Sequence, residues 1–305
     1  HFYALEVLRV NGSEAQQRRL YAEVLAGKRF GNALAELGTR TALDRNTRLT
    51  RTDDGYRIDG RKFYCTGALF AQRIPTLAVD EHGVGFLAFV PREAKGLQLI
   101  DDWSGFGQRT TGSGSVLFDS VPVAADDVVP FQSAFDRPTT VGPFAQLLHA
   151  AIDTGIARGA YEDLLQFVRN KSRPWIDSGV DKASDDPLTQ QEIGKLRVRL
   201  AATEALLERA GEFVDRAQLA PDEHSVAAAS IAVAEARAIS TETSLLLGSK
   251  LLELSGSRAT LAEFGLDRHW RNARTHTLHD PVRWKYHAIG DYYLNDRLPP
   301  RRGTI

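Results

Sequence analysis

The sequence predicts an α+β chain with a helical part, a β-domain and a helical bundle in succession. Three observations support this order. A helix-capping pattern with an apolar stripe precedes residue 28, short strand-like runs follow, and long helical stripes occupy the remainder. We therefore expect an N-terminal helical part at 1–28, a middle antiparallel β-domain at 29–130 and a C-terminal helical bundle at 131–305.

Composition narrows the functional classes. At 305 residues and 33.6 kDa the chain can bury a large core. A net charge of -1 and a pI near 6.8 give no electrostatic reason to expect nucleic acid or an anionic membrane as a partner. The single cysteine, Cys65, excludes an internal disulfide framework, and no apolar run reaches the length of a membrane span. These features predict a cytoplasmic protein.

The chain opens on a helix that has already begun. It starts at His1, contains no methionine, and places Phe2, Leu5 and Leu8 in an apolar helical pattern. We therefore expect that residues 1–28 are the remnant of a longer, truncated helical domain.

Within this part, Ser13 and Gln16 have the spacing of a capping box. The helical stripe that follows them ends at Gly27, a residue suited to a helix C-terminus.

Short β-branched or aromatic runs alternate with turn residues in the second part. Such repeated runs are typical of an antiparallel sheet or a small barrel. The turns are Asp53–Gly55, Asp59–Gly60 and Glu81–Gly83, and the clearest runs are Thr76–Val79, Val84–Val90 and Ser115–Val121.

Long helical periodicity begins after Pro143. Small residues such as Gly155 and Gly159 lie in the first stripe and favour close helix contact. Thr189 and Glu192 suggest a capping box for a second helix. Pro221–Asp222 opens a third helix, which Gly256 ends.

The turn Arg271–Pro281 is the most unusual stretch. Asp280 is a good N-cap, and Pro281 suits the first helical position. His279 would then precede a helix N-terminus, whose positive dipole end favours a neutral imidazole ring. The alternative is an ordinary polar turn between two helices.

Several other sites are not indicated. The sequence has no GxGxxG after a strand and no GxxxxGK[ST], so neither a dinucleotide fold nor a P-loop is expected. His276 and His279 lack a third ligand at metal spacing, and no metal is expected. His149 reads as a core histidine, and Asp185–Asp186 as a solvated loop.

Three segments together resemble a known superfamily. They are Arg29–Glu36 (RFGNALAE), Gly60–Gly67 (GRKFYCTG) and Asp101–Ser115 (DDWSGFGQRTTGSGS). With the helix–sheet–helix order and a strand that ends in Val121-Pro122, they resemble the acyl-CoA dehydrogenase superfamily. More narrowly, RFGNALAE, DDW, Ser172–Trp175 and above all the turn Arg271–Pro281 are similar to the flavin-dependent monooxygenase branch, which includes dibenzothiophene monooxygenases and sulfur-acquisition oxidoreductases.

Two departures separate the chain from a true dehydrogenase. Dehydrogenases carry a catalytic glutamate near the position that here reads Thr277-Leu278-His279, so no base for thioester chemistry is evident. The segment that holds the FAD adenosine in dehydrogenases here contains Arg258, which suits the terminal phosphate of FMN. An FAD-dependent acyl-CoA dehydrogenase remains the alternative enzyme. The alternative that is not an enzyme is a helical scaffold that binds no flavin.

The resemblance implies roles for seven residues. Catalytic positions would be His279, Thr66 and Asn32, and cofactor-binding positions would be Trp103, Ser113, Arg173 and Arg258. The family usually has serine at the Thr66 position, so the hydroxyl is kept. Without the resemblance, Trp103 would read equally well as a core residue and Arg173 as a surface helix end.

The resemblance also implies a reaction and partners. The protein would use reduced FMN and O2 to oxygenate a small organosulfur substrate. Because the chain has no nicotinamide fingerprint, the reduced flavin would come from a separate NAD(P)H-flavin reductase. A homotetramer with a flavin site shared between subunits is expected as well.

Overall fold

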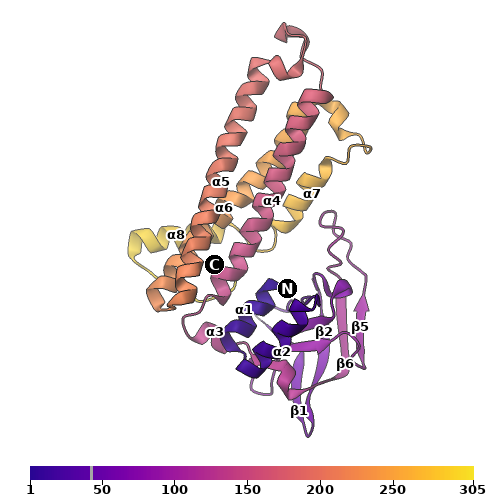
Figure 1. Ribbon diagram of the computed structural model, residues 1–305, viewed down its shortest axis with the longest axis vertical. Coiled ribbons are helices and arrows are strands. Elements are labelled where there is room, and N and C mark those ends of the chain that lie inside the picture. Colours follow the sequence, from indigo (N-terminus) through magenta and orange to yellow (C-terminus); the bar gives the residue numbers. More distant parts are fainter. Residues whose placement is uncertain (42–43) are drawn as a thin grey trace. The chain divides into compact units, whose positions relative to one another are not determined.

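The computed structural model describes residues 1–41 and 44–305, which form two compact units (Figure 1). Unit 1 consists of His1–Gly105 and Arg109–Val141, and unit 2 of Phe106–Gln108 and Gly142–Ile305. Unit 1 holds the whole sheet and unit 2 the long helices, which confirms the predicted α+β class with a helical C-terminal part. The predicted domain boundaries at residues 28 and 130 stay predictions.

Unit 1 begins with helices α1 (Phe2–Asn11) and α2 (Glu14–Leu25). The predicted capping box is present: the Gln16 backbone N–H donates to Ser13 Oγ, and the Ser13 N–H donates to the Gln16 side chain. Gly27 follows α2 with a φ of 90°, a conformation that favours glycine. A short helix α3 (Ser133–Asp136) lies later in the unit.

A seven-stranded sheet forms the rest of unit 1, in the order β5-β6-β2-β1-β3-β4-β7. The strands are β1 (Arg48–Thr52), β2 (Gly55–Lys62), β3 (Arg73–Val79), β4 (Gly85–Pro91), β5 (Leu97–Ile100), β6 (Ser115–Val123) and β7 (Val128–Pro130).

Not every strand pair is antiparallel, which corrects the prediction of a wholly antiparallel domain. β1 meets β3 in parallel through one pair, Arg48 with Val79. The rest of this edge of β3 is bridged by Phe30 and Ala33, also in parallel. The segment around Asn32 therefore runs along β3 as an extra, irregular strand.

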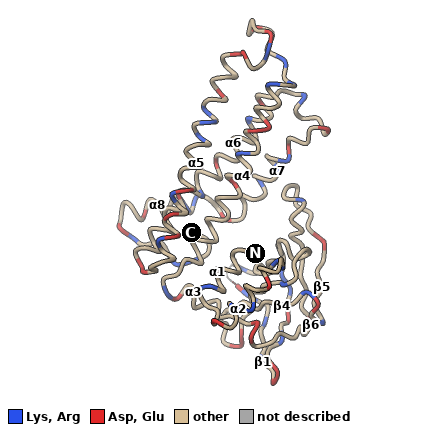
Figure 2. The backbone as a smooth tube through the Cα atoms, in the orientation of Figure 1, with Lys and Arg blue, Asp and Glu red and all other residues tan. Residues whose placement is uncertain are grey.

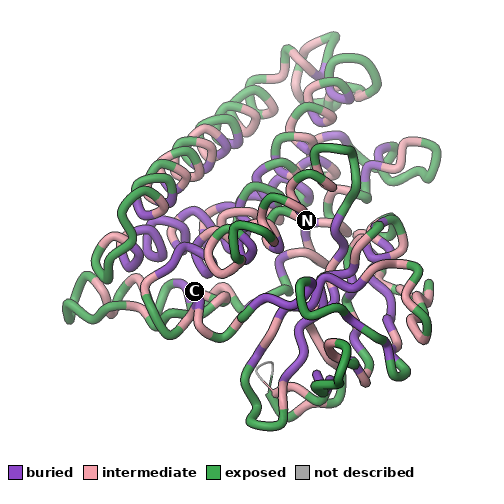
Figure 3. Tube along the Cα trace, turned by 60° about the horizontal axis from the view of Figure 1, so that its bottom comes forward, coloured by how far each residue is buried: buried purple, intermediate pink, exposed green. Residues whose placement is uncertain are grey.

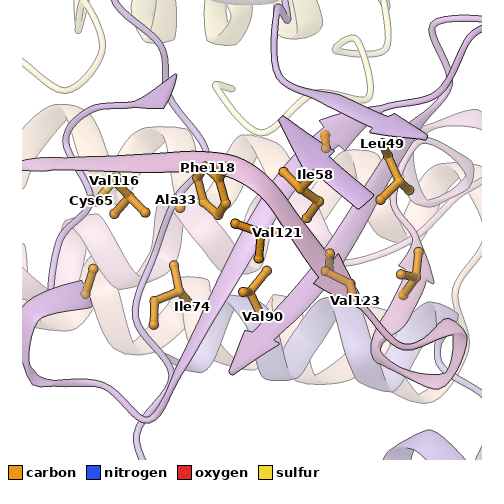
Figure 4. Packing of buried hydrophobic residues seen from close by; sticks show 14 residues of the cluster. Ala33, Leu49, Ile58, Cys65, Ile74, Val90, Val116, Phe118, Val121 and Val123 are labelled. Atoms are coloured by element: carbon orange, nitrogen blue, oxygen red, sulfur yellow. The ribbon is translucent and has the colours of Figure 1, made fainter. Parts of the chain in front are cut away.

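A cluster of buried apolar side chains, most of them small or β-branched, packs against the sheet (Figure 4). Ile58, Ile74, Val90, Val116 and Val121 are all completely or almost completely buried there. Their close packing gives the strands that lead to the candidate site a fixed register.

Unit 2 is built on three long helices, α4 (Val141–Asn170), α5 (Pro187–Leu219) and α6 (Glu223–Ser255). Buried positions follow the helices where they face one another (Figure 3), and α6 is the most buried of them. Gly256 ends α6 with a φ of 80°, as predicted. Two shorter helices, α7 (Asp267–His276) and α8 (Arg283–Asn295), pack against α6.

Short 3-10 turns complete the described chain: Ala68–Phe70, Ala125–Asp127, Ile176–Ser178, Ala183–Asp185 and Ser257–Thr260.

Two predicted helix starts are wrong. Helix α5 begins at Pro187, and its N-cap is Asp186, which accepts hydrogen bonds from the Leu188 N–H and from the Thr189 hydroxyl. Thr189 is therefore not the N-cap but donates a hydrogen bond to it. Asp186, predicted as a solvated loop residue, is the N-cap of α5. Pro187 at the first helical position explains the earlier start.

Helix α8 begins at Arg283 and not after Asp280. Val282 occupies the N-cap position without a side-chain hydrogen bond, and Asp280 is instead buried against Lys285. The helix-dipole argument for His279 therefore loses its basis, because the ring does not stand directly before a helix N-terminus.

Acidic and basic residues alternate along the long helices without a large field of one sign (Figure 2). Among residues 1–41 and 44–305, no helix combines the length and the low polarity that a membrane span needs.

Candidate flavin site

Thr66 and Ser113 are brought together in unit 1. Their hydroxyl oxygens lie 2.8 Å apart, and Thr111 Oγ1 lies 2.6 Å from Ser113 Oγ. The backbone pairs the same two segments, since the Cys65 N–H donates to the Gly114 carbonyl and the Gly67 N–H to the Thr111 carbonyl. Thr66 is exposed while Ser113 is buried, so the pair joins a residue at the surface to one inside unit 1.

The segment that carries Asn32 approaches the chain just after Thr66. A Cβ on Gly31 would lie 2.8 Å from Ala68 Cα, so only glycine allows the Asn32 segment to approach the backbone after Thr66 so closely. The Gly31 N–H also donates to the Arg73 carbonyl on β3.

A buried ion pair fixes the other end of the Asn32 segment. Lys62 Nζ lies 2.6 Å from Glu36 Oε1 and also donates to the Leu34 carbonyl. Burial lowers the pKa of Lys62 to about 8, although Glu36 favours its charged form. The glutamate of the first motif and the lysine of the second are thus a structural pair that sets the position of Asn32.

Trp103 is half-buried next to the same loop. Its ring makes an edge contact with Tyr64, with centroids 6.1 Å apart, and a Cβ on Gly105 would collide with it. Tyr64 has a φ of 55°, an uncommon value for a bulky residue. Strained backbone of this kind is often found at functional sites.

The loop that carries Trp103 is anchored at Asp102. Its two carboxylate oxygens accept hydrogen bonds from the Ser115 N–H and Oγ, at 2.6 and 2.7 Å. Cys65, also in this region, is a buried thiol whose pKa is raised by burial to about 12, so it is no nucleophile.

In unit 2, His279 lies within a polar cluster, half exposed. Its Nδ1 is 3.1 Å from Asp280 Oδ1, and its ring centroid is 3.9 Å from that of His149. His149 Nδ1 in turn lies 3.0 Å from His276 Nε2. His149 is therefore a hydrogen-bonded core histidine, as predicted, and also a member of the histidine cluster.

Buried charges support these rings. Asp153 Oδ1 lies 2.6 Å from His276 Nδ1, and its other oxygen forms an ion pair with Arg237, both side chains being almost completely buried. Asp280 pairs with Lys285 at 2.5 Å. Burial alone would raise the pKa of Asp280, but the hydrogen bond with His279 and the positive charge of Lys285 hold it well below its usual range.

The pKa of His149 is lowered to about 2, mainly by burial and further by the neighbouring His279 and His276 rings. His149 is therefore a neutral imidazole at any ordinary pH. Within the described parts of the chain, no group of three or more His, Cys, Asp or Glu side chains is arranged to hold a metal ion.

Arg173 and Arg258 lie at neighbouring segments of unit 2. The Ser172 hydroxyl donates to the Ser255 carbonyl, just before the Gly256 turn that leads to Arg258. Both arginines are exposed, and among the residues that the structure describes neither forms an ion pair. Arg258 only lies over the Phe264 ring, at 5.5 Å. Two unpaired guanidinium groups are suitable donors for a phosphate.

The seven predicted residues thus form separate groups: Thr66, Ser113, Asn32 and Trp103 in unit 1, and the two arginines and His279 at different places in unit 2. Sequence reasoning missed Asp153 and Arg237. A charged residue within the alanine-rich, almost wholly buried stretch of α6 was the available indication for Arg237.

Comparison with known proteins gives the family. The profile described as "Acyl-CoA dehydrogenase, C-terminal domain" matches residues 147–284. Dibenzothiophene monooxygenase of Rhodococcus erythropolis is 31% identical over 318 residues, covering 98% of this chain and 76% of that protein. The probable FMNH2-dependent monooxygenase SfnC of Pseudomonas putida is 35% identical over 280 residues, covering 88% and 69%.

The structure of FMN-bound TdsC from Paenibacillus sp. A11-2 superposes with a TM-score of 0.95 at 33% identity, covering 100% of this chain and 80% of that one. Both the sequence and the fold therefore agree with the resemblance found in the motifs. The chain belongs to the flavin-dependent monooxygenase branch of the acyl-CoA dehydrogenase superfamily.

Proposed function

We propose that the protein is a two-component flavin-dependent monooxygenase that uses reduced FMN and O2 to oxygenate a small organosulfur compound. The observation that carries the proposal is the similarity of this chain, over its whole length, to the FMN-bound structure of TdsC. The resemblance also implies that a dehydrogenase has its glutamate near Thr277-Leu278-His279, where this chain has none. The relatives named above are dibenzothiophene and FMNH2-dependent monooxygenases, and they support the same choice. An acyl-CoA dehydrogenase is not favoured.

The side chains present fit FMN. Arg173 and Arg258 are exposed and unpaired within the described chain, and their charge suits the single terminal phosphate. The hydroxyls of Thr66 and Ser113 and the ring of Trp103 are suitable for a polar, planar flavin. Bound as the reduced form, FMN would supply two electrons and react with oxygen.

The residues of this chain would control that chemistry. Thr66, supported by Ser113, and Asn32 would offer neutral hydrogen-bonding groups. His279 would accept a proton at Nε2, the ring nitrogen that is not directed at Asp280, and give it back. Trp103 would cover the flavin and exclude water, which limits unproductive release of reduced oxygen.

We further propose that a separate NAD(P)H-flavin reductase delivers the reduced FMN, that the protein forms a homotetramer, and that at least one arginine of each phosphate site comes from a neighbouring subunit.

The experiment has two arms. In the first, the protein is supplied with FMN, a flavin reductase and NADH, and oxygen uptake is measured on sulfides, sulfoxides, sulfones and dibenzothiophene. In the second, FAD, an electron-accepting dye and acyl-CoA thioesters replace them. We expect substrate-dependent product in the first arm only. Dye reduction by a thioester would instead identify a dehydrogenase. A protein that binds flavin in neither arm would be a scaffold.

A further inference from the structure

The ring of His149 lies between two other histidines, a position that the proposed reaction does not yet use. One edge meets His276, with 3.0 Å between His149 Nδ1 and His276 Nε2. One face meets His279, with ring centroids 3.9 Å apart and an angle of 41° between the rings. His149 is on α4, whereas the other two are near the end of α7, so the contact is made by the fold.

The charges around these rings balance. Asp153 is paired with Arg237, and Asp280 with Lys285, and all four side chains are buried. A proton added to the buried His149 ring would therefore be an uncompensated charge, which is strongly unfavourable. The His149 ring is neutral.

The hydrogen-bond partners fix the positions of the protons. The Asp153 carboxylate only accepts, so the His276 ring donates to it from Nδ1. With a neutral His276 ring, Nε2 carries no proton and accepts a hydrogen bond from His149 Nδ1. Likewise, Asp280 accepts from His279, so a neutral His279 carries its proton on Nδ1 and keeps Nε2 as a free acceptor. The other neutral tautomer, with the proton on Nε2, would leave Nδ1 without a proton to donate to Asp280.

We propose that His149 is a positioning residue for His279. The Asp153–His276 pair orients the neutral ring of His149, and the ring of His279 stacks on it. In this position His279 directs Nδ1 at Asp280 and keeps Nε2 free. His279 is half exposed, and only these two contacts hold its ring among the interactions of the described chain. Without the stack the ring can turn, and Nδ1 and Nε2 can exchange roles.

The catalytic consequence rests on the proposed function. A general acid or base works only if the correct nitrogen points at the reacting group, and a small displacement of that nitrogen lowers the rate strongly. His149 would then affect how much reduced FMN leads to oxygenated product, without touching flavin or substrate.

Two substitutions separate the ring from the hydrogen bond. His149→Phe keeps a flat ring beneath His279 but loses the donor to His276. His149→Asn keeps an N–H donor near the Nδ1 position but loses the ring. His224→Asn, at the exposed start of α6, is the matched control.

The first readout needs no flavin. In protein labelled with 15N-histidine, long-range proton–nitrogen NMR reports which ring nitrogen of His279 is protonated, and His279→Ala identifies its signals. We expect the Nδ1-protonated tautomer in the wild type, in His149→Phe and in His224→Asn. In His149→Asn we expect a mixture of both tautomers.

The second readout is product formed per reduced FMN consumed, with FMN affinity measured alongside. We expect a loss on the order of 10-fold in His149→Asn with unchanged FMN affinity, and a smaller loss in His149→Phe. An unchanged His279 tautomer in His149→Asn would overturn the proposal, as would loss of the tautomer in a folded His149→Phe. If His149→Asn does not fold, the His149→Phe spectrum decides alone. If the wild type forms no product but keeps the tautomer, the proposed function fails and the positioning role stands.

Discussion

Single side chains in unit 2 have separable roles. His279 is half exposed and faces Asp280, whereas Arg258 is exposed and, within the described chain, has no ion-pair partner. The first is suited to proton chemistry and the second to a phosphate. Substitution should therefore affect different steps.

For His279→Ala we expect nearly unchanged FMN affinity and a fall in product formation by roughly one to three orders of magnitude, because a positioned proton-transfer group is lost. Release of hydrogen peroxide should rise as product falls. Arg258→Ala should weaken FMN binding and leave the product yield intact at saturating flavin. Flavin titration with product and peroxide assays checks both variants, and loss of flavin binding in His279→Ala would make the histidine structural.

The lowered pKa of His149 predicts how stability depends on pH. Between pH 6.5 and about pH 2 the unfolded chain binds a proton at this position and the folded chain does not. The free energy of unfolding should therefore fall as the pH drops below 6.5, by up to about 1.4 kcal/mol per pH unit from this group. Urea unfolding from pH 7 to 5 measures it. His149→Asn should show a shallower slope, and equal slopes would contradict the burial of a neutral His149.

At the scale of elements, the close approach of Gly31 to Ala68 fixes the position of the Asn32 segment in unit 1. Gly31→Ala would place a Cβ 2.8 Å from Ala68 Cα, and backbone must move. We expect a loss of roughly 1–3 kcal/mol in stability and lower product yield. Gly194→Ala, in α5 where an added Cβ meets no atom, should instead raise stability by up to about 1 kcal/mol. Denaturant unfolding of both variants tests this, and equal stabilities would contradict the close contact.

Local patterns in the sequence predicted the elements whose determinants are local. The Ser13 capping box and the Gly256 helix end were correct because a few adjacent residues decide them. The start of α8 was wrong because Asp280 is drawn into ion pairs with Lys285 and Arg237, and Arg237 is distant in sequence. The pair with Arg237 is not visible in a window of ten residues.

The candidate site shows the same division. The motifs led to Thr66 and Ser113, which are 47 positions apart in the sequence and whose hydroxyls are hydrogen-bonded in the fold. The part played by His149 was not predictable, since its apolar helical face is typical of a core histidine. Its partner His276 is 127 positions away. The flavin roles themselves stay predictions until a bound complex is measured.

At the scale of the whole molecule, we expect a homotetramer. Light scattering at micromolar concentration should give four times the 33.6 kDa chain mass. Mixing Arg173→Ala with Arg258→Ala protein then tests whether the two arginines of a site come from different subunits: if they do, hybrid tetramers should recover part of the FMN binding that each variant lacks. A monomeric mass would contradict the shared site, and no recovery in confirmed hybrids would place both arginines of a site on one subunit.

The central claim is that this chain transfers oxygen from O2 to a substrate with reduced FMN. The most direct measurement is turnover under 18O2 with FMN, a flavin reductase, NADH and an organosulfur substrate of the panel, followed by mass spectrometry of the product. We predict one 18O atom for each oxygenation, none when the flavin is left out, and strongly reduced labelling in His279→Ala. Product oxygen that comes from water, or labelled product formed equally well without the protein, would contradict the account.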